Sequence, residues 1–314
     1  MSFPIPASRA RLGLLRVCLA GVLWGTGGLV MRLIADRQPM GVTTVSAWRM
    51  VVAALALVVA LAVTRGFRDL VALMRRRPLT AIAVGACTGA YQALYFGAVV
   101  DVGVTVSTVV ALGLAPALLT VAESIAARRF PSRVRVSVLA AALAGLGLVS
   151  VSAGSDTTGP RPLLGVLLAA ASGTTYAVAT GIGRPLTSIT TPFSLAAASS
   201  TAGAVLLVPL ALVAGGPRLP NGPDVLGLLV YLGVATLAVA YALLYAGLRT
   251  VTGSAALVAT LLEPLTAALL AAALLGERLG VLGLVGAGLI LVAVAGFEDT
   301  DAEDGPVPEG PAPL

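Results

Sequence analysis

Residues 253–275 read GSAALVATLLEPLTAALLAAALL, an apolar stretch whose one ionisable side chain is Glu263. A helix needs about 20 mainly apolar residues to cross the hydrocarbon core of a bilayer, and this stretch reaches that length. The whole chain has the same character, since 58% of its 314 residues are hydrophobic and 11% are charged. Soluble domains carry about 25% charged residues. The composition therefore indicates an integral membrane protein.

Further apolar stretches of similar length precede and follow this one, separated by helix-stop signals such as Arg75-Arg76-Arg77-Pro78. They predict an all-α membrane protein with ten transmembrane helices. In chain order, the predicted spans are 14–34, 44–63, 79–100, 104–126, 134–152, 163–182, 193–213, 225–248, 253–275 and 279–296.

Several kinds of chemistry are excluded by the residue types that the chain lacks. It has no histidine and no lysine, so all 20 basic residues are arginine. Ser–His catalysis, histidine metal sites and P-loops are therefore ruled out. Cys18 and Cys87 both lie in apolar stretches and are interpreted as packing residues, not as a disulfide or metal pair. We expect neither an enzyme nor a bound metal or cofactor.

The arginine distribution predicts the orientation in the membrane. With the N-terminus inside, the cytoplasmic segments receive most of the arginines, including Arg75, Arg76, Arg77, Arg128 and Arg129. The positive-inside rule then places both termini in the cytoplasm. The arginine excess is interpreted as a topology signal, so no nucleic-acid partner is expected. The composition suggests a bacterial inner membrane, and the acidic, proline-rich residues 298–314 predict a disordered cytoplasmic tail.

Two halves of the chain resemble each other. Leu94-Tyr95-Phe96-Gly97 matches Leu244-Tyr245-Ala246-Gly247, and Leu114-Ala115-Pro116-Ala117 aligns with Leu262-Glu263-Pro264-Leu265. This predicts two five-helix repeats, residues 13–152 and 163–297. Because five is odd, the second repeat must enter the membrane in the opposite orientation, as in the inverted repeats of many transporters.

The chain resembles the EamA family of the drug/metabolite transporter superfamily over residues 13–297. The resemblance rests on Leu23-Trp24-Gly25, Ala47-Trp48-Arg49, Leu261-Leu262-Glu263-Pro264, Leu274-Leu275-Gly276-Glu277-Arg278 and Gly286-Ala287-Gly288-Leu289-Ile290. It implies ten helices, cytoplasmic termini and a central cavity between the halves. Arg128-Arg129-Phe130 stands where the first half would repeat Gly-Glu-Arg, which is a departure from the pattern.

Glu263 is the first candidate for the functional site, because an ionisable residue at mid-membrane depth is energetically expensive. The following Pro264 lacks a backbone donor and frees carbonyl groups to face a cavity. The carboxyl group could bind an amine or exchange a proton, or it could only hydrogen-bond a neighbouring helix. Arg49 either reaches the interface or pairs with a carboxylate that joins helices. Glu123 is expected to form an interfacial ion pair with Arg128 or Arg129.

Aromatic residues supply the remaining candidates. Tyr91 and Tyr95, like Tyr241 and Tyr245, are four residues apart and share one helix face, where they could line a substrate cavity or simply pack. Trp24 and Gln92 are further candidates for the same cavity. Pro116 and Pro264 occupy matching mid-helix positions and could act as paired gating kinks or only shape the packing.

These features predict a secondary transporter that works by alternating access on a small-molecule substrate. The resemblance makes export of amino acids or related metabolites the leading hypothesis, with protons as a candidate coupling ion. The alternatives are a multidrug or nucleoside transporter of the same fold, and a membrane scaffold or sensor that transports nothing. The sequence leaves open whether the protein is a monomer or a homodimer.

Overall fold

A computed structural model describes residues 7–152, 160–214, 219–275 and 280–304, and within these ranges the chain forms helices and no strand. In chain order the helices are α1 (Ala7–Arg37), α2 (Val42–Val63), α3 (Phe67–Arg76), α4 (Pro78–Val102), α5 (Val104–Ala127), α6 (Arg133–Ser152), α7 (Pro162–Leu186), α8 (Pro192–Val213), α9 (Pro223–Gly233), the π-helical segment η1 (Val234–Val239), α10 (Ala240–Gly247), α11 (Gly253–Ala259), α12 (Leu262–Leu275) and α13 (Val281–Asp304).

Nine helical stretches in the described part of the chain are long and apolar enough to cross a membrane. Two of them combine several elements: α9, η1 and α10 make up Pro223–Gly247, and α11 with α12 makes up Gly253–Leu274. The predicted tenth span, 279–296, overlaps the apolar segment Val281–Gly296 of α13, which is shorter than the other nine. The protein is therefore an all-helical, multi-pass membrane protein.

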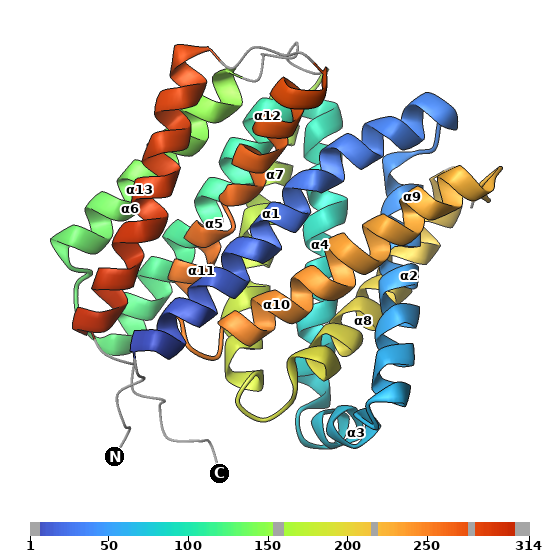
Figure 1. Ribbon diagram of the computed structural model, residues 1–314, viewed down its shortest axis with the longest axis horizontal. Coiled ribbons are helices and arrows are strands. Elements are labelled where there is room, and N and C mark those ends of the chain that lie inside the picture. Colours follow the sequence, from blue (N-terminus) through green and yellow to red (C-terminus); the bar gives the residue numbers. More distant parts are fainter. Residues whose placement is uncertain (1–6, 153–159, 215–218, 276–279, 305–314) are drawn as a thin grey trace.

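Helix α3 is not among the predicted spans, because its ten residues are too few to cross a bilayer. It is amphipathic: Leu73 is buried, whereas Arg68, Arg75 and Arg76 are exposed. In Figure 1 it lies across the lower end of the bundle, beside the end of α2. Such a helix suits the boundary between lipid and water.

The last helix differs from the sequence expectation at its end. α13 continues to Asp304, beyond residue 297, where the disordered tail was expected to begin. No glycine or proline interrupts residues 298–304, so nothing in the local sequence stops the helix there. Residues 305–314 of the expected tail lie outside the described residues.

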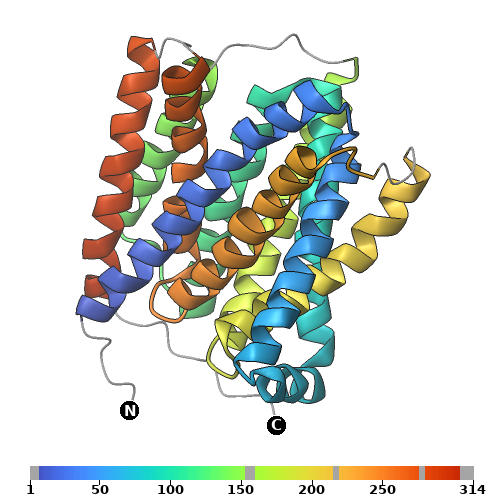
Figure 2. The ribbon, with the colours of Figure 1, turned by 45° about the vertical axis from the view of Figure 1, so that its right-hand side comes forward.

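The bundle has two ends. Its lower end holds the start of α1, the end of α13, and the junctions between α5 and α6 and between α10 and α11 (Figure 1). Its upper end holds the start of α5, the end of α6 and the start of α13. Figure 2 gives the same arrangement from a second direction, with α1 inclined across the bundle. The first helix α1 packs against α10 and α12, and α7 packs against α4 and α5.

Small residues allow some of these helices to approach closely. A Cβ added to Gly145 of α6 would lie 2.7 Å from the carbonyl oxygen of Gly286 of α13, and one added to Gly286 would lie 2.7 Å from the carbonyl oxygen of Gly145. Lipid provides no hydrophobic drive for helices to associate, so such close backbone packing holds them together. A larger residue at either position would separate α6 from α13.

The outer surface of the bundle is apolar. Val213, Leu79 and Val63 are among its most exposed large side chains, at 87%, 81% and 80%. Hydroxyl residues such as Ser172 and Ser194 are instead fully buried between helices. On a soluble protein so much exposed apolar surface would drive aggregation, but in a bilayer the lipid is its solvent.

Candidate functional site

Two adjoining cavities lie among the helices. The larger, here called the wide lobe, has a volume of about 580 Å³, and the smaller, the narrow lobe, about 190 Å³. Trp24, Tyr91, Tyr95 and Glu263 line both lobes. These four are all residues that the sequence singles out, and the fold brings them together from α1, α4 and α12.

Glu263 reaches the cavity at a break in the ninth span. α11 ends at Ala259 and α12 begins at Leu262. The Pro264 nitrogen has no hydrogen to donate. The Thr260 carbonyl instead accepts a hydrogen bond of 2.9 Å from the Glu263 backbone nitrogen. The Glu263 carboxyl group forms no hydrogen bond with any residue that the structure describes, so it is available to a ligand in either lobe.

A glycine on α1 allows α1 and α12 to pack closely beside the site. A Cβ on Gly25 would lie 2.5 Å from both the carbonyl oxygen of Glu263 and the Cβ of Thr266. Real side chains do not approach so closely, so only glycine permits this contact between α1 and α12. The neighbouring Trp24 lines the same two lobes as Glu263.

Arg49 lines the narrow lobe from α2. Its Nη2 donates to the Thr236 Oγ1 at 3.1 Å, and its buried Nε has no hydrogen-bond partner. Thr236 belongs to η1, a π-helical segment of the kind often found at functional sites. The sequence suggested either an interfacial position or a carboxylate partner for Arg49. Within the described ranges, no ion pair joins it to a carboxylate.

Gln92 brings a second unsatisfied polar group to the narrow lobe. Its side chain is 6% exposed, and neither its Oε1 nor its Nε2 has a hydrogen-bond partner. Buried polar atoms without partners are rare and call for an explanation, such as a ligand or a water molecule that completes them. Gln92 and Arg49 thus both line the narrow lobe, and each has buried polar atoms without a hydrogen-bond partner.

Aromatic rings form the walls between the lobes. The Tyr91 and Tyr95 rings stack with centroids 6.2 Å apart, and Tyr91 also packs at 4.8 Å against Tyr176 of α7. Tyr176 lines the narrow lobe but was not a sequence candidate. Tyr176 has no tyrosine four residues away and no matching tyrosine in the other half of the chain. The pattern that identified the other tyrosines therefore does not include it.

Three of the expected site residues differ in their position relative to the cavities. Tyr241 lines the narrow lobe as expected. Tyr245 lines neither lobe: it is 2% exposed, and its hydroxyl group lies 2.9 Å from the Ser199 Oγ, which suits packing between α10 and α8. Pro116 is buried within an uninterrupted α5, unlike Pro264, which lies next to a helix break.

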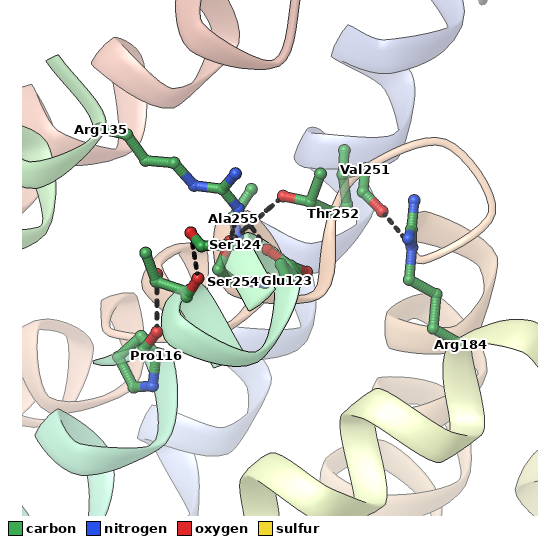
Figure 3. A network of polar contacts seen from close by, with 10 residues as sticks. Pro116, Glu123, Ser124, Arg135, Arg184, Val251, Thr252, Ser254 and Ala255 are labelled. Atoms are coloured by element: carbon green, nitrogen blue, oxygen red, sulfur yellow. Dashed lines mark hydrogen bonds and ion pairs between the residues drawn. The ribbon is translucent and has the colours of Figure 1, made fainter. Parts of the chain in front are cut away.

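The expected pairing of Glu123 with Arg128 or Arg129 is wrong. Figure 3 shows the Glu123 carboxylate in contact with Arg135 of α6 and Ser254 of α11. Arg128 has a left-handed backbone conformation (φ 53°) at the end of α5 and Arg129 follows it in the turn, whereas Arg135 lies on the returning helix that packs beside α5. Proximity in sequence was a poor guide because the helix ends between these residues.

The site offers groups of several kinds that can bind a ligand. It combines one carboxyl group, one guanidinium group, one free amide and several aromatic faces inside the apolar bundle. Among the described residues, no cluster of three or more cysteine, aspartate or glutamate side chains could hold a metal ion. The fold and the site together define a multi-pass helical membrane protein with a ligand-sized, amphoteric internal cavity.

The comparison with known families agrees with this class. The model of the EamA-like transporter family matches residues 11–151 and again residues 163–297, so the chain belongs to that family, which is part of the drug/metabolite transporter superfamily. The protein is accordingly a membrane transporter of this type. Gly276, Glu277 and Arg278 of the resembling sequence lie outside the described residues.

A curated bacterial protein and a solved structure are similar to the chain. The "Uncharacterized transporter YwfM" of Bacillus subtilis (strain 168) is 31% identical over 283 residues, which cover 88% of this chain and 90% of that protein. A crystal structure at 19% identity has a TM-score of 0.75 and covers 90% of this chain and 95% of its own. At that identity the structural likeness concerns the fold alone.

Proposed function

We propose that the protein is a secondary transporter that exports amino acids or related small metabolites by alternating access. The observation that carries the proposal is the pair of opposite charges on one cavity: Glu263 and Arg49 both line the narrow lobe without an ion pair between them. A buried charge is costly unless a partner compensates it. A zwitterionic ligand would supply a partner to each.

The groups around the two charges fit such a ligand. An ammonium group would meet the Glu263 carboxylate and the aromatic faces of Trp24 and Tyr91, which attract cations. A carboxylate would lie on the Arg49 and Gln92 side of the narrow lobe, since guanidinium groups bind planar carboxylates well. The apolar part of the ligand would extend into the wide lobe, along Ala267 and Ala271 of α12.

Two features support alternating access. The first is the proposed pair of inverted five-helix repeats, residues 13–152 and 163–297. Each repeat's first helix, α1 or α7, packs against the third and fourth spans of the other repeat. This reciprocal exchange is what a pseudo-two-fold axis in the membrane plane would produce. It requires α13 to act as a tenth span.

The second feature is the position of the wide lobe. Its lining includes Val104, the first residue of α5, and Ser152, the last residue of α6. The wide lobe therefore extends from Glu263 to the upper end of the bundle. With both termini in the cytoplasm of a bacterial cell, the upper end would be the outer face. The structure would then correspond to the outward-open state of an exporter. Protons are the proposed coupling ion.

Flux measurements in proteoliposomes test the proposal. Purified protein should drive efflux of zwitterionic amino acids from a panel that also contains a nucleoside and a cationic dye. Glu263→Gln and Arg49→Gln should each reduce this efflux strongly. Asp224→Asn is the matched control, because the Asp224 side chain is 60% exposed and its ion pair with Arg37, at 3.4 Å, is exposed as well.

The panel also separates the alternatives. Flux of the nucleoside or the dye without amino-acid flux would show that the protein is a transporter of a different substrate class. Absence of flux for every compound, in protein that remains folded and monodisperse, would favour a scaffold or sensor.

A further inference from the structure

Three side chains from different helices meet at the lower end of the bundle. Glu123 of α5 accepts a hydrogen bond from Arg135 of α6 through Oε2, and the same oxygen accepts one of 2.6 Å from the Ser254 Oγ of α11. The Ser254 backbone nitrogen donates to the other carboxylate oxygen at 3.2 Å, and Arg135 also donates to the Ser254 Oγ. Every pair among the three is therefore in contact (Figure 3).

These contacts exclude solvent. The Arg135 and Glu123 side chains are 8% and 12% exposed. Breaking a buried ion pair leaves a charge without compensation unless water enters, so such a pair separates only when its surroundings open. The start of α11 fits tightly against it, because a Cβ on Gly253 would lie 3.1 Å from the Glu123 Oε1 and 3.0 Å from the Leu119 Cδ1.

The contacts lie on the closed side of the candidate site. All of α11, from Gly253 to Ala259, is buried. Leu257, which lies along the chain between Ser254 and Glu263, packs in one buried cluster with Leu119 and Tyr176. The wide lobe extends from Glu263 in the opposite direction, to the upper end.

We propose that Glu123, Arg135 and Ser254 form a latch that closes the lower end of the transport pathway while the cavity is open toward the upper end. This inference rests on the proposed alternating access. Glu123 and Arg135 belong to the first predicted repeat and Ser254 to the second. An opening of the lower end moves the two repeats apart at α11, and it must break the contacts of Ser254 with Glu123 and Arg135.

Accessibility of a reporter cysteine tests the latch without any substrate. The reporter is Leu257→Cys, which is 1% exposed in this conformation, in a background with Cys18→Ala and Cys87→Ala. A membrane-impermeant thiol reagent is applied to purified protein in vesicles from the lower-end face. Adding Glu123→Gln should raise the labelling rate at least about tenfold, because conformational couplings between sites are commonly of that size.

Two further latch variants and one control keep the test decisive. Glu123→Arg combined with Arg135→Glu restores opposite charges at the same positions and should return labelling toward the parent rate. If Glu123→Gln does not fold, the double change Glu123→Gln with Arg135→Gln removes both charges, leaves no unpaired one, and should still raise labelling. Asp224→Asn, which breaks the exposed Arg37–Asp224 pair at the upper end, should change nothing.

Equal labelling in the parent and in every folded latch variant would overturn the latch, whatever the flux results are. Faster labelling in Glu123→Gln, or in the double change to Gln, supports it, even if none of the compounds in the flux panel is transported. Failure of the latch and failure of the proposed substrate class are therefore distinguishable.

Discussion

The Trp24 indole of α1 packs edge-on against the Tyr241 ring of α10, with centroids 5.3 Å apart and an angle of 64° between the planes. The contact joins the first and the eighth predicted spans, which are far apart in the sequence. Trp24 lines both lobes and Tyr241 lines the narrow one. This aromatic contact therefore forms part of the wall of the candidate site and also joins the two predicted repeats.

Trp24→Ala should weaken substrate binding more than it weakens the fold. Losing one aromatic face from a cation-binding wall costs roughly 0.5–2 kcal/mol, so the KM for amino-acid efflux should rise roughly 2- to 30-fold. Trp48→Ala is the control, because Trp48 packs against the separate cluster of Val30, Ile34 and Val45. Equal effects of the two substitutions on KM would show that Trp24 does not contribute specifically to substrate binding.

Arg49→Gln should discriminate between ligands with and without a carboxylate. A hydrogen bond to a charged group contributes about 1.5–3 kcal/mol, so KM for amino acids should rise about 10- to 100-fold. The corresponding amines, which lack the carboxylate, should be affected much less. Competition of both series against a labelled amino acid measures this. A uniform loss across both series would indicate that Arg49 only supports the helix packing through Thr236.

Glu263→Gln should remove the dependence of flux on a pH gradient. The substitution nearly keeps the shape of the side chain, so folding should survive, but the amide cannot exchange a proton. In the wild type, acidifying the compartment that receives the substrate should accelerate export, because protons return as substrate leaves. If the variant keeps this dependence while its apparent affinity falls, Glu263 binds an amine only. Unchanged flux and pH dependence would leave it a structural role.

Gly25→Ala should destabilise the contact of α1 with α12 and lower the thermal unfolding temperature in detergent. The added methyl group would meet backbone and side-chain atoms at 2.5 Å, and overpacking of this kind costs about 1–3 kcal/mol. Gly28→Ala, one turn further along the same helix, is the control because no atom lies within 4 Å of the added Cβ. Identical unfolding temperatures for the two variants would contradict the close packing at Gly25.

The predicted orientation can be tested in intact cells with single cysteines. Replacements at Asp36, Thr157 and Pro220 should react with an impermeant reagent from outside, and a replacement at Arg76 should react only after the membrane is opened. The reason is the excess of arginine in the segments assigned to the cytoplasm. Labelling at Arg76 in intact cells would reverse the assignment of the two ends of the bundle.

Much of the fold could be predicted from the sequence, because the lipid bilayer constrains each spanning segment separately. A helix in lipid must satisfy its backbone within itself and must be apolar for about 20 residues, and both requirements are visible in one stretch of chain. The predicted spans from 14–34 to 279–296 accordingly fall on the helices of the structure. The α3 helix was missed because its ten residues carry no such signal.

Within the site, the residues that lipid makes unusual could be recognised from the sequence. Glu263, Arg49, Trp24 and the Tyr91–Tyr95 pair stand out as ionisable or aromatic groups in apolar spans, and the structure brings them to adjoining cavities. The packing of the helices, in contrast, is what turns Tyr245 away from the cavities and brings Tyr176 to the narrow lobe. It also decided that Glu123 pairs with Arg135 and Ser254 rather than with its sequence neighbours. The physical reason is that span composition depends on local contact with lipid, whereas side-chain partners depend on which helix faces pack together.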